Sequence, residues 1–477
     1  MSAVVEVGKS NQLKNLAPAL QRVAQALLDA LGGNRVLLGE DVTGRSAGIW
    51  RSDNVKAQVL VRPRSTEEVS RIMQICHAHD RSVIAHGGTT GLVESALTTD
   101  QDVVLSLEHM NEIEAVNPME RTAVVQSGVI LQTLQERVAE DGLVFPLDLG
   151  SRGSCTVGGN ISTNAGGNRV IRFGMTRDMV LGLEAVLADG TIISSMNQMI
   201  KNNAGYDLKQ LFIGTEGTLG IVTRAVLRCR EAPKTQPTVL LGVESFGKLQ
   251  SLLKLADGEL GGAMSAFEVM WNNYYQLVTT EPAKNQAPLP DHYAYYVLLE
   301  AMGSSDEQVQ HMLEAAFESG VIEDAVFAQS ETQRLALWGL RDDVEQAFRH
   351  GPIFLFDVSL RIPFMEDYVE QVNQSLAQAF PELVNFVLGH MGDGNLHFAI
   401  GVNDDSHDAR KRVEACVYEP LAAIGGSVSA EHGVGLEKQP YLHIARSEPE
   451  IALMRTLKQA LDPKGILNPD KIFSFQA

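Results

Sequence analysis

Apolar residues recur at two different periods along the chain, and these periods predict alternating strands and helices. A β-branched run near residue 60 stops at Pro63, and Ser65 followed by Glu68 is the capping-box pattern of a helix start. The apolar face of that helix consists of Val69, Ile72, Met73 and Cys76. The stretch SVIAH then returns as a strand and runs into a glycine-rich turn. Alternation of this kind to about residue 230 predicts an α/β or α+β domain.

A change in pattern follows at REAPKTQPT (230–238), which is typical of a linker because it is polar and contains two prolines. Beyond it, apolar runs predict strands at TVLLGVESF, SAFEVMW, YAYYVLLEA and FLFDVSLRIP. Helical spacing predicts helices over 306–318 and 365–379, and another after Ser447, with Pro449 in its first turn and Pro463 beyond its end. This half of the chain therefore reads as a second α+β domain.

The N-terminal pattern predicts an amphipathic helix over 11–31 that packs on the body of the protein, with a membrane-surface helix as the alternative. Neither a secretory signal nor a transmembrane run is expected, so the predicted location is cytoplasmic. The predicted divisions are an N-terminal helical segment, a first domain, a second domain and a C-terminal segment, with the bounds 1–40, 41–230, 231–425 and 426–477.

Composition narrows the function classes. Of the 477 residues, 44% are apolar and 21% charged, as expected of a globular protein with a large core. The net charge of −20 argues against nucleic acid as a partner, and an anionic substrate would need local cations. The four cysteines are far apart without CxxC spacing, which predicts reduced, mostly buried thiols.

Three glycine-rich stretches lie in the first domain: HGGTTGL (86–92), GGNISTNAGGNRVIRFG (158–174) and FIGTEGTLGIVT (212–223). Glycine lets backbone N–H groups approach a ligand closely, and concave loops of N–H groups bind phosphate. None of the three fits GxGxxG, which disfavours a Rossmann nicotinamide site. Together, with threonine, serine and asparagine between the glycines, they predict a large phosphate-bearing cofactor.

Two histidines bracket a tight turn in GHMGDGNLH (389–397), and a glutamate precedes a histidine in SAEHGVGLEK (429–438). His390, His397 and Glu431 form a two-histidine, one-carboxylate set that suits Zn²⁺ with one position open, and also suits Fe²⁺ or Mn²⁺. The plainer alternative is that these histidines are ordinary polar residues. Asp393 and Asn395 are expected to shape the turn through side-chain hydrogen bonds.

These stretches, with KNNAGYDLKQLFIGTEGTLGIVT and DPKGILNPDKIF, occur from about residue 50 to the C-terminus in an order that resembles one flavoprotein family. That family is the FAD-dependent D-2-hydroxy-acid dehydrogenases (the D-2-hydroxyglutarate and D-lactate dehydrogenase group) within the vanillyl-alcohol oxidase and p-cresol methylhydroxylase flavoproteins. The resemblance implies an α+β fold. It would comprise a two-subdomain FAD-binding domain of the p-cresol methylhydroxylase type, an α+β substrate (cap) domain and a C-terminal segment returning to the flavin.

The resemblance also implies the residues that hold FAD. The loop at 86–92 would hold the pyrophosphate, and the bond to flavin would be non-covalent because Thr89 stands where some relatives carry a flavin-linked histidine. The implied set is His86, Gly87, Gly88, Thr89, Thr90, Gly91, Leu92, Gly150, Ser151, Gly158, Gly159, Asn160, Ser162, Thr163, Asn164, Gly166, Gly167, Gly217, Gly220, Ile221 and Asn468.

The implied reaction is the metal-assisted oxidation of a D-2-hydroxy acid to a 2-oxo acid, with hydride transfer to flavin N5. The family places its metal ligands at His390, His397 and Glu431. His432 is the expected general base, or alternatively a group that orients Glu431. Arg341 matches the arginine that anchors the substrate carboxylate, or alternatively pairs with Glu345 on its own helix. Asn395 is expected near flavin or substrate.

Partners and substrate follow from the same resemblance. The expected electron acceptor is an electron-transfer flavoprotein or a quinone, and a homodimer is expected. D-2-Hydroxyglutarate is the favoured substrate, D-lactate the alternative, and an oxygen-using oxidase or an electron carrier without its own substrate the competing readings. Glu345, Leu355 and Ala399 depart from residues that help to hold the five-carbon diacid in close relatives. Arg361 could supply a replacement anchor for a distal carboxylate.

Overall fold

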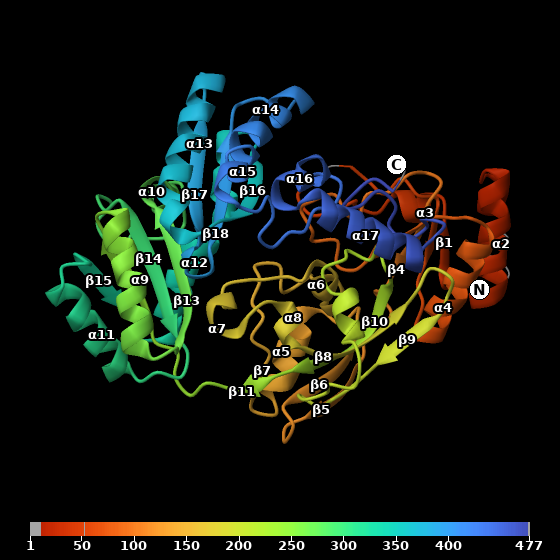
Figure 1. Cartoon of the computed structure of the whole chain (residues 1–477), viewed down its shortest axis with the longest axis horizontal. Coiled ribbons are helices and arrows are strands. Elements are labelled where there is room, and N and C mark those ends of the chain that lie inside the picture. The colour runs from red at the N-terminus through yellow and green to blue at the C-terminus, as the bar shows by residue number, and fades with distance from the viewer. Residues whose placement is uncertain (1–10, 52, 476–477) are drawn as a thin grey trace.

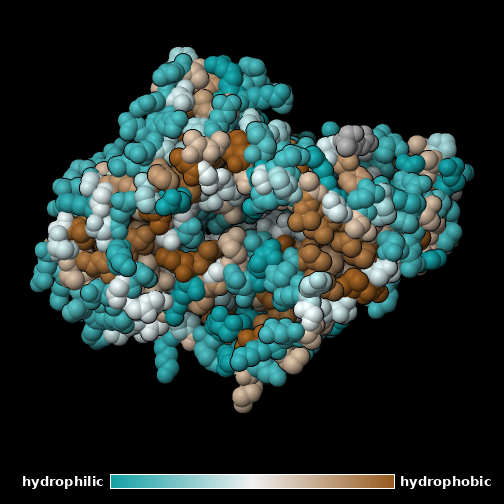
Figure 2. Space-filling model, in the orientation of Figure 1, coloured by the Kyte–Doolittle hydropathy of each residue, from teal (hydrophilic) through white to brown (hydrophobic). Residues whose placement is uncertain are grey.

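The computed structural model describes residues 11–51 and 53–475, arranged as two bodies with a C-terminal segment between them (Figure 1). One body contains the chain up to about residue 230, and the other contains a large antiparallel sheet with its helices. Polar and charged residues cover most of the outline in Figure 2, in keeping with the net charge of −20.

The first body begins with a four-stranded sheet whose first pair of strands is antiparallel and whose other two pairs are parallel. Its strands, in sheet order, are β1 (Val36–Leu38), β2 (Val59–Val61), β4 (Val103–Ser106) and β3 (Val83–His86). The helices α2 (Pro18–Leu31) and α4 (Thr66–Ala78) share one apolar core with these strands. Strand β3 ends at His86, so the glycine-rich turn leaves the sheet at the carboxyl end of a parallel strand, where ligands bind in open α/β sheets.

A second sheet of the first body is antiparallel throughout. Its strands, in sheet order, are β5 (Ile113–Asn117), β6 (Thr122–Gln126), β10 (Ile221–Arg228), β8 (Val180–Val186) and β9 (Ile192–Ser195). Its core is shared with α5 (Leu131–Ala139) and α6 (Val157–Thr163). The short helices α3 (Glu40–Thr43), α7 (Val170–Phe173) and α8 (Thr176–Met179) and the pair β7 (Leu143–Val144) and β11 (Arg230–Glu231) complete this body.

The second body is a seven-stranded antiparallel sheet. Its strands, in sheet order, are β15 (Asp324–Phe327), β12 (Thr238–Val243), β14 (Tyr295–Ala301), β13 (Met264–Trp271), β17 (Val384–His390), β18 (Asn395–Gly401) and β16 (Phe354–Ser359). One face packs on α9 (Phe246–Leu260), α11 (Asp306–Glu318), α13 (Met365–Ala379) and α14 (His407–Tyr418). The other face packs on α10 (Asn272–Thr279) and α12 (Glu331–Asp342).

The C-terminal segment returns to the first body. After α15 (Leu421–Ile424) come α16 (Leu442–Ala445) and α17 (Glu448–Leu461), and the chain then runs beside β3. The N–H of Val83 donates to the carbonyl of Ile466 at 2.7 Å, and the N–H of Asn468 donates to the carbonyl of Val83 at 2.9 Å. These bonds bring the end of the chain to the strand that precedes the first glycine loop.

Most predicted elements are confirmed, with local differences. Ser65 Oγ accepts the N–H of Glu68 at 3.3 Å, but the Glu68 carboxylate accepts from Arg64 rather than completing the box at Ser65. The helix predicted over 11–31 is divided: residues 11–14 are helical, and α2 begins at Pro18, which has no N–H to continue the earlier turn. The stretch TAVVQSGVIL (122–131), whose apolar residues predict a strand, is a strand only to Gln126, where a turn leads into α5.

The cysteines and the lengths of the apolar helices can be compared with the expectations from composition. All four cysteines are free, and three of them are buried. Over the described ranges, the longest apolar helical stretches fall short of what is needed to cross a bilayer.

Candidate functional site

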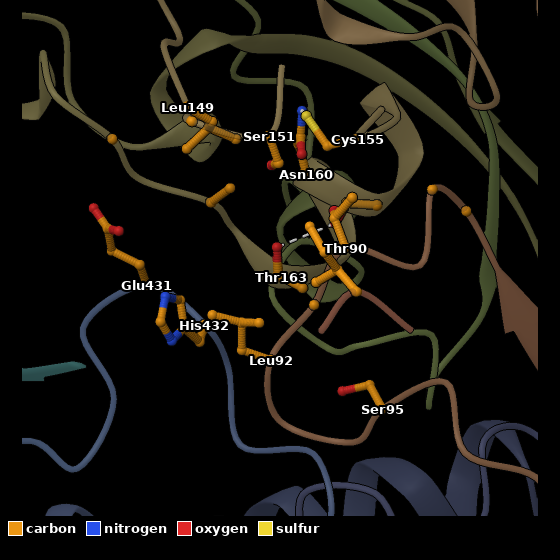
Figure 3. A pocket seen from close by; sticks show the side chains of 18 of the residues that line it. Thr90, Leu92, Ser95, Leu149, Ser151, Cys155, Asn160, Thr163, Glu431 and His432 are labelled. Carbon is orange, nitrogen blue, oxygen red and sulfur yellow. Dashed lines mark hydrogen bonds between the residues drawn. The ribbon is translucent and has the colours of Figure 1, made fainter. Parts of the chain in front are cut away.

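A cavity of about 530 Å³ lies where the two bodies and the C-terminal segment meet. Its wall includes the glycine loop after β3, most of α6, the start of β16, the end of β17, the middle of β18, and residues 431–432. Figure 3 shows Glu431 and His432 on the C-terminal loop, across the cavity from Thr90 and Thr163. Ligand cavities usually fall between about 300 and 1,000 Å³.

The glycine loop packs closely on the start of α6. A Cβ on Gly87 would lie 2.5 Å from Thr156 Oγ1, and one on Gly88 would lie 2.1 Å from the carbonyl oxygen of Ser154. Thr156 caps α6 by accepting the N–H of Gly159 at 3.4 Å. The N–H groups of Val157, Gly158 and Gly159 at the helix start already donate to Val129, Ser127 and Thr156. The glycine loop is therefore the part of this wall that can offer backbone N–H groups to the pyrophosphate of a dinucleotide.

Gly88→Ala is expected to lower the free energy of unfolding by about 1–3 kcal/mol, because the added methyl group must displace backbone. It should also lower the fraction of purified protein that retains FAD, measured by flavin absorbance per chain. Gly247→Ala is the control, since a Cβ there meets nothing within 4 Å and alanine is the better helix former. Wild-type stability and flavin content in Gly88→Ala would contradict the close packing.

The three predicted metal ligands lie together on the cavity wall. Each of His390, His397 and Glu431 offers a ligand atom, and these atoms all lie within 4.8 Å of one another. His390 Nε2 is 3.6 Å from Glu431 Oε1, close to the separation of about 3.4 Å between two ligands of a tetrahedral Zn²⁺. Burial lowers the pKa of His397 well below its usual range, which favours the neutral imidazole that a metal requires. Burial lowers the pKa of His390 but the Glu268 carboxylate raises it by more, so this histidine must lose its proton to bind a metal. The identity and spacing of the donor set fit a divalent cation.

Glu268 supports two of these groups from β13. Its Oε1 is 2.7 Å from His390 Nδ1, and its Oε2 accepts from Arg341 Nε at 2.8 Å. Burial raises the pKa of this carboxyl, but the charges of His390 and Arg341 lower it by a larger amount. The net shift of the pKa is therefore downward. An ionised Glu268 that accepts from Nδ1 leaves His390 Nε2 as the ligand atom, the usual role of a carboxylate behind a metal-binding histidine. In this structure Nε2 faces Arg341 Nη2 at 3.0 Å.

Asp357 supports the opposite side of the site. This fully buried carboxylate on β16 lies 2.9 Å from His432 Nδ1 and also pairs with the buried ammonium of Lys438. Its Oδ2 accepts the backbone N–H groups of residues 430–432 at 2.8–3.1 Å. Burial raises its pKa, but His432, Lys438 and these N–H groups bring the net value well below the usual range. Asp357 thus fixes the loop that carries Glu431 and leaves His432 Nε2 free.

The structure separates some alternatives that the sequence left open. Arg341 pairs with Glu268 and, at 3.6 Å, with Asp342; no ion pair joins it to Glu345. The imidazole of His432 contacts Asp357 rather than the Glu431 carboxylate. Glu345 lines the cavity, as do Leu355 and Ala399.

Of the residues expected to hold FAD, all but Asn164 and Gly220 line the cavity. Asn164 ends α6 in the left-handed conformation, and its Oδ1 accepts the N–H of Arg177 at 2.9 Å. Gly220 is packed against Phe212, where a Cβ would lie 2.8 Å from the ring. Both residues therefore shape the fold around the cavity instead of lining it.

Two expected substrate residues are not brought to the cavity wall. Asn395 is 3% exposed, and its side-chain amide has no hydrogen-bond partner. Arg361 is exposed, and its guanidinium carbon lies 5.2 Å from the centre of the Phe364 ring. The interpretation of Arg361 as a distal carboxylate anchor thus has no support from its position.

Sequence reasoning missed three buried carboxylates, those of Glu268, Asp357 and Glu216. Glu216 lines the cavity and accepts the N–H groups of Val434 at 2.7 Å and Gly435 at 3.0 Å, which holds the loop after His432. A usable signal was present, because Glu268 and Asp357 each interrupt an apolar strand run, and a charge in such a run is almost always paired.

Comparison with known proteins agrees with this geometry. Residues 57–195 match the family described as "FAD binding domain", and residues 232–472 match "FAD linked oxidases, C-terminal domain". A mitochondrial D-2-hydroxyglutarate dehydrogenase of Danio rerio is 37% identical over 93% of this chain and 83% of its own length. The chain belongs to the FAD-dependent D-2-hydroxy-acid dehydrogenase family.

Other members and fold relatives extend the picture. A Schizosaccharomyces pombe chain named provisionally as a mitochondrial D-lactate dehydrogenase is 37% identical over 87% of this chain and 82% of its own length. A p-cresol methylhydroxylase structure superposes with a TM-score of 0.76 at 17% identity, covering 97% of this chain and 99% of that one. The expected family and its p-cresol methylhydroxylase-type α+β fold are therefore confirmed, and the matched domain is one that binds FAD.

Proposed function

We propose that this protein is an FAD-dependent, metal-assisted dehydrogenase that oxidises a D-2-hydroxy acid to the 2-oxo acid. The observation that carries the proposal is the convergence of His390, His397, Glu431, His432 and Arg341 on one cavity with the glycine loop of an FAD-binding domain. Relatives that match most of this chain are named as dehydrogenases of D-2-hydroxyglutarate and, provisionally, D-lactate.

In this proposal each group has one task. FAD, when bound, supplies the hydride acceptor. A divalent cation held by His390, His397 and Glu431 would lower the pKa of a substrate hydroxyl. Arg341 would bind the substrate carboxylate, for which a guanidinium is geometrically suited. His432 Nε2 would accept the hydroxyl proton, while Asp357 holds Nδ1 and thereby the tautomer.

Four further assignments belong to the same proposal: the electron acceptor, the oligomeric state, the location and the substrate. Those of the acceptor and the substrate rest on family resemblance. The electron acceptor would be an electron-transfer flavoprotein or a quinone. The working form would be a homodimer located in the cytoplasm, although the two relatives compared above are named as mitochondrial. Within the family's range, the Danio rerio relative is named for D-2-hydroxyglutarate, the favoured substrate, and the Schizosaccharomyces pombe relative for D-lactate, the alternative.

The proposal is tested by mixing the flavinated protein with D- and L-2-hydroxy acids without oxygen. At least one D-acid is expected to bleach the flavin within the turnover range of ordinary enzymes, about 1–10³ s⁻¹, and its L-enantiomer should be far slower. A flavin that no hydroxy acid reduces would be that of an electron carrier and would contradict the proposal.

A further inference from the structure

The strands that carry the metal ligands continue into an uncharged surface. Side chains alternate along a strand, so His397 and Ala399 of β18 lie on one face, and Asp357 and Leu355 of β16 lie on the same face because the two pairs are in register. Ala399 and Leu355 line the cavity one row, or about 7 Å, beyond His397. A substrate bound at the metal ligands would contact Ala399 and Leu355 if its side chain extended along these strands.

The neighbouring wall is acidic. The end of α12 and the 3₁₀ helix η2 (Val344–His350) bring Asp342, Asp343, Val344 and Glu345 to the cavity. Asp343 is held by the side-chain amides of Asn285 and Gln346, while Glu345 is exposed. A ligand that extends past Arg341 therefore meets valine or carboxylates.

Arg341 is the only arginine or lysine among the described residues that line this cavity. Its Nε donates to Glu268, its Nη2 faces His390 Nε2 at 3.0 Å and its Nη1 lies 3.6 Å from an Asp342 oxygen, so it can serve at most a single substrate carboxylate. The cavity wall thus contains one anion-binding side chain, apart from the metal ligands themselves.

Two arginines just outside the wall are already paired. A smaller adjoining cavity, which shares Leu355, includes Arg51 and Arg410. Arg51 pairs with Asp53 at 2.7 Å and Glu94 at 2.9 Å. Arg410 pairs with Glu414 at 3.0 Å and Glu437 at 2.7 Å.

On the other side of the main cavity, Arg169 pairs with Asp148 and Glu300, each at 3.1 Å. A second substrate carboxylate would have to break one of these pairs or remain without a counter-ion.

From this distribution of charge we infer that the site selects D-2-hydroxy acids with one carboxylate and an uncharged side chain, and that Leu355 and Glu345 determine this choice. The inference rests on the proposed function and narrows it away from D-2-hydroxyglutarate. A carboxylate that enters the cavity without a counter-ion loses hydration free energy that no new interaction replaces. Asp343 and Glu345 would in addition repel it. An aliphatic side chain has no charge to desolvate at Ala399 and Leu355, and it gains free energy there by burying apolar surface.

The test compares two substrates of equal carbon number, D-2-hydroxyvalerate and D-2-hydroxyglutarate, on the flavinated, metal-loaded protein. The kcat/KM of anaerobic flavin reduction is expected to be at least about 10²-fold higher for the monoacid. If D-2-hydroxyglutarate is equal or better, the inference is overturned and the proposed function stands. If neither these acids nor other D-2-hydroxy acids reduce the flavin, the proposed function fails and the inference with it.

Two variants test the residues named. Leu355→Lys places an ammonium in the uncharged row and should raise the diacid-to-monoacid ratio of kcat/KM at least about tenfold, while Leu355→Met should leave the ratio within about twofold. Glu345→Lys, with Glu345→Gln as its control, makes the same test at an exposed position, where substitutions usually change stability little. An unchanged ratio in the folded lysine variants overturns the assignment of these residues.

Binding provides a readout that is independent of turnover. Calorimetric titration of the oxidised protein with 2-oxopentanoate and 2-oxoglutarate should show the same preference and the same reversal in the lysine variants. Equal affinities of the two 2-oxo acids for the wild-type protein would overturn the inference even if their rates of formation differed.

Discussion

His397→Ala is expected to lower kcat/KM for a D-2-hydroxy acid by about 10³-fold or more, which corresponds to about 4 kcal/mol of lost transition-state stabilisation. His397 is one of three ligand atoms that lie within 4.8 Å of one another, and two remaining ligands hold a divalent cation poorly. A cation that polarises the substrate oxygen contributes several kcal/mol, so its loss should dominate the rate. The measurement is anaerobic flavin reduction with parallel elemental analysis of the purified protein.

A surface histidine provides the matched control. His311 lies on α11 with its side chain 72% exposed, and His311→Ala should retain both the metal and the rate. Treating the wild-type protein with a chelator should reproduce the His397→Ala rate, and adding back Zn²⁺, Mn²⁺ or Fe²⁺ one at a time should identify the effective ion. A metal-free protein that keeps its FAD and its full rate would exclude metal assistance.

The parts of the site that sequence reasoning found are those in which the chemistry is local. The turn between His390 and His397 is a hairpin of β17 and β18, and Glu431 and His432 are adjacent in the chain. Helix starts were predictable for the same reason, because capping at Ser65 and Ser447 involves residues three positions away.

The parts that were missed depend on the pairing of strands far apart in sequence. Glu268 reaches His390 because β13 pairs with β17 in a register that sets these two residues opposite each other. Asp357 reaches His432 because β16 pairs with β18 and the C-terminal loop crosses the end of that pair. No local pattern gives the order of seven strands, and that order decides which buried carboxylate supports which histidine.

Arg361 is a second residue whose position could not be predicted from the local sequence pattern. A cation beside a predicted buried strand suggests a distal anchor, but β16 ends at Ser359 and the chain turns into η3 (Ile362–Phe364). That turn carries the Arg361 guanidinium over Phe364 and away from the cavity. β16 ends two residues before Arg361, and this end point determines whether the Arg361 guanidinium can reach a substrate.

Removal of the imidazole of His432 is expected to lower kcat by about 10²–10⁴-fold, the usual contribution of a general base. His432→Asn is the most direct variant, because the amide keeps a polar group of similar reach without the basicity of imidazole.

Asp357→Asn should lower kcat by about 10²-fold or more, because its amide cannot hold the Nδ1–H tautomer of His432 or neutralise Lys438 as a carboxylate does. Both rates are measured by single-turnover flavin reduction with a substrate deuterated at C2.

Metal content decides between the two roles considered for His432. If His432 only oriented Glu431, His432→Asn would lose metal, and added metal would restore its rate. The imidazole contacts Asp357, and the position of Glu431 is fixed by its own backbone N–H, which donates to Asp357 at 2.8 Å. His432→Asn should therefore keep its metal and FAD, remain slow at saturating metal, and bind the 2-oxo acid with an affinity close to that of the wild type. A variant that is slow only when metal-depleted would assign His432 to orientation and leave the proton acceptor to another group.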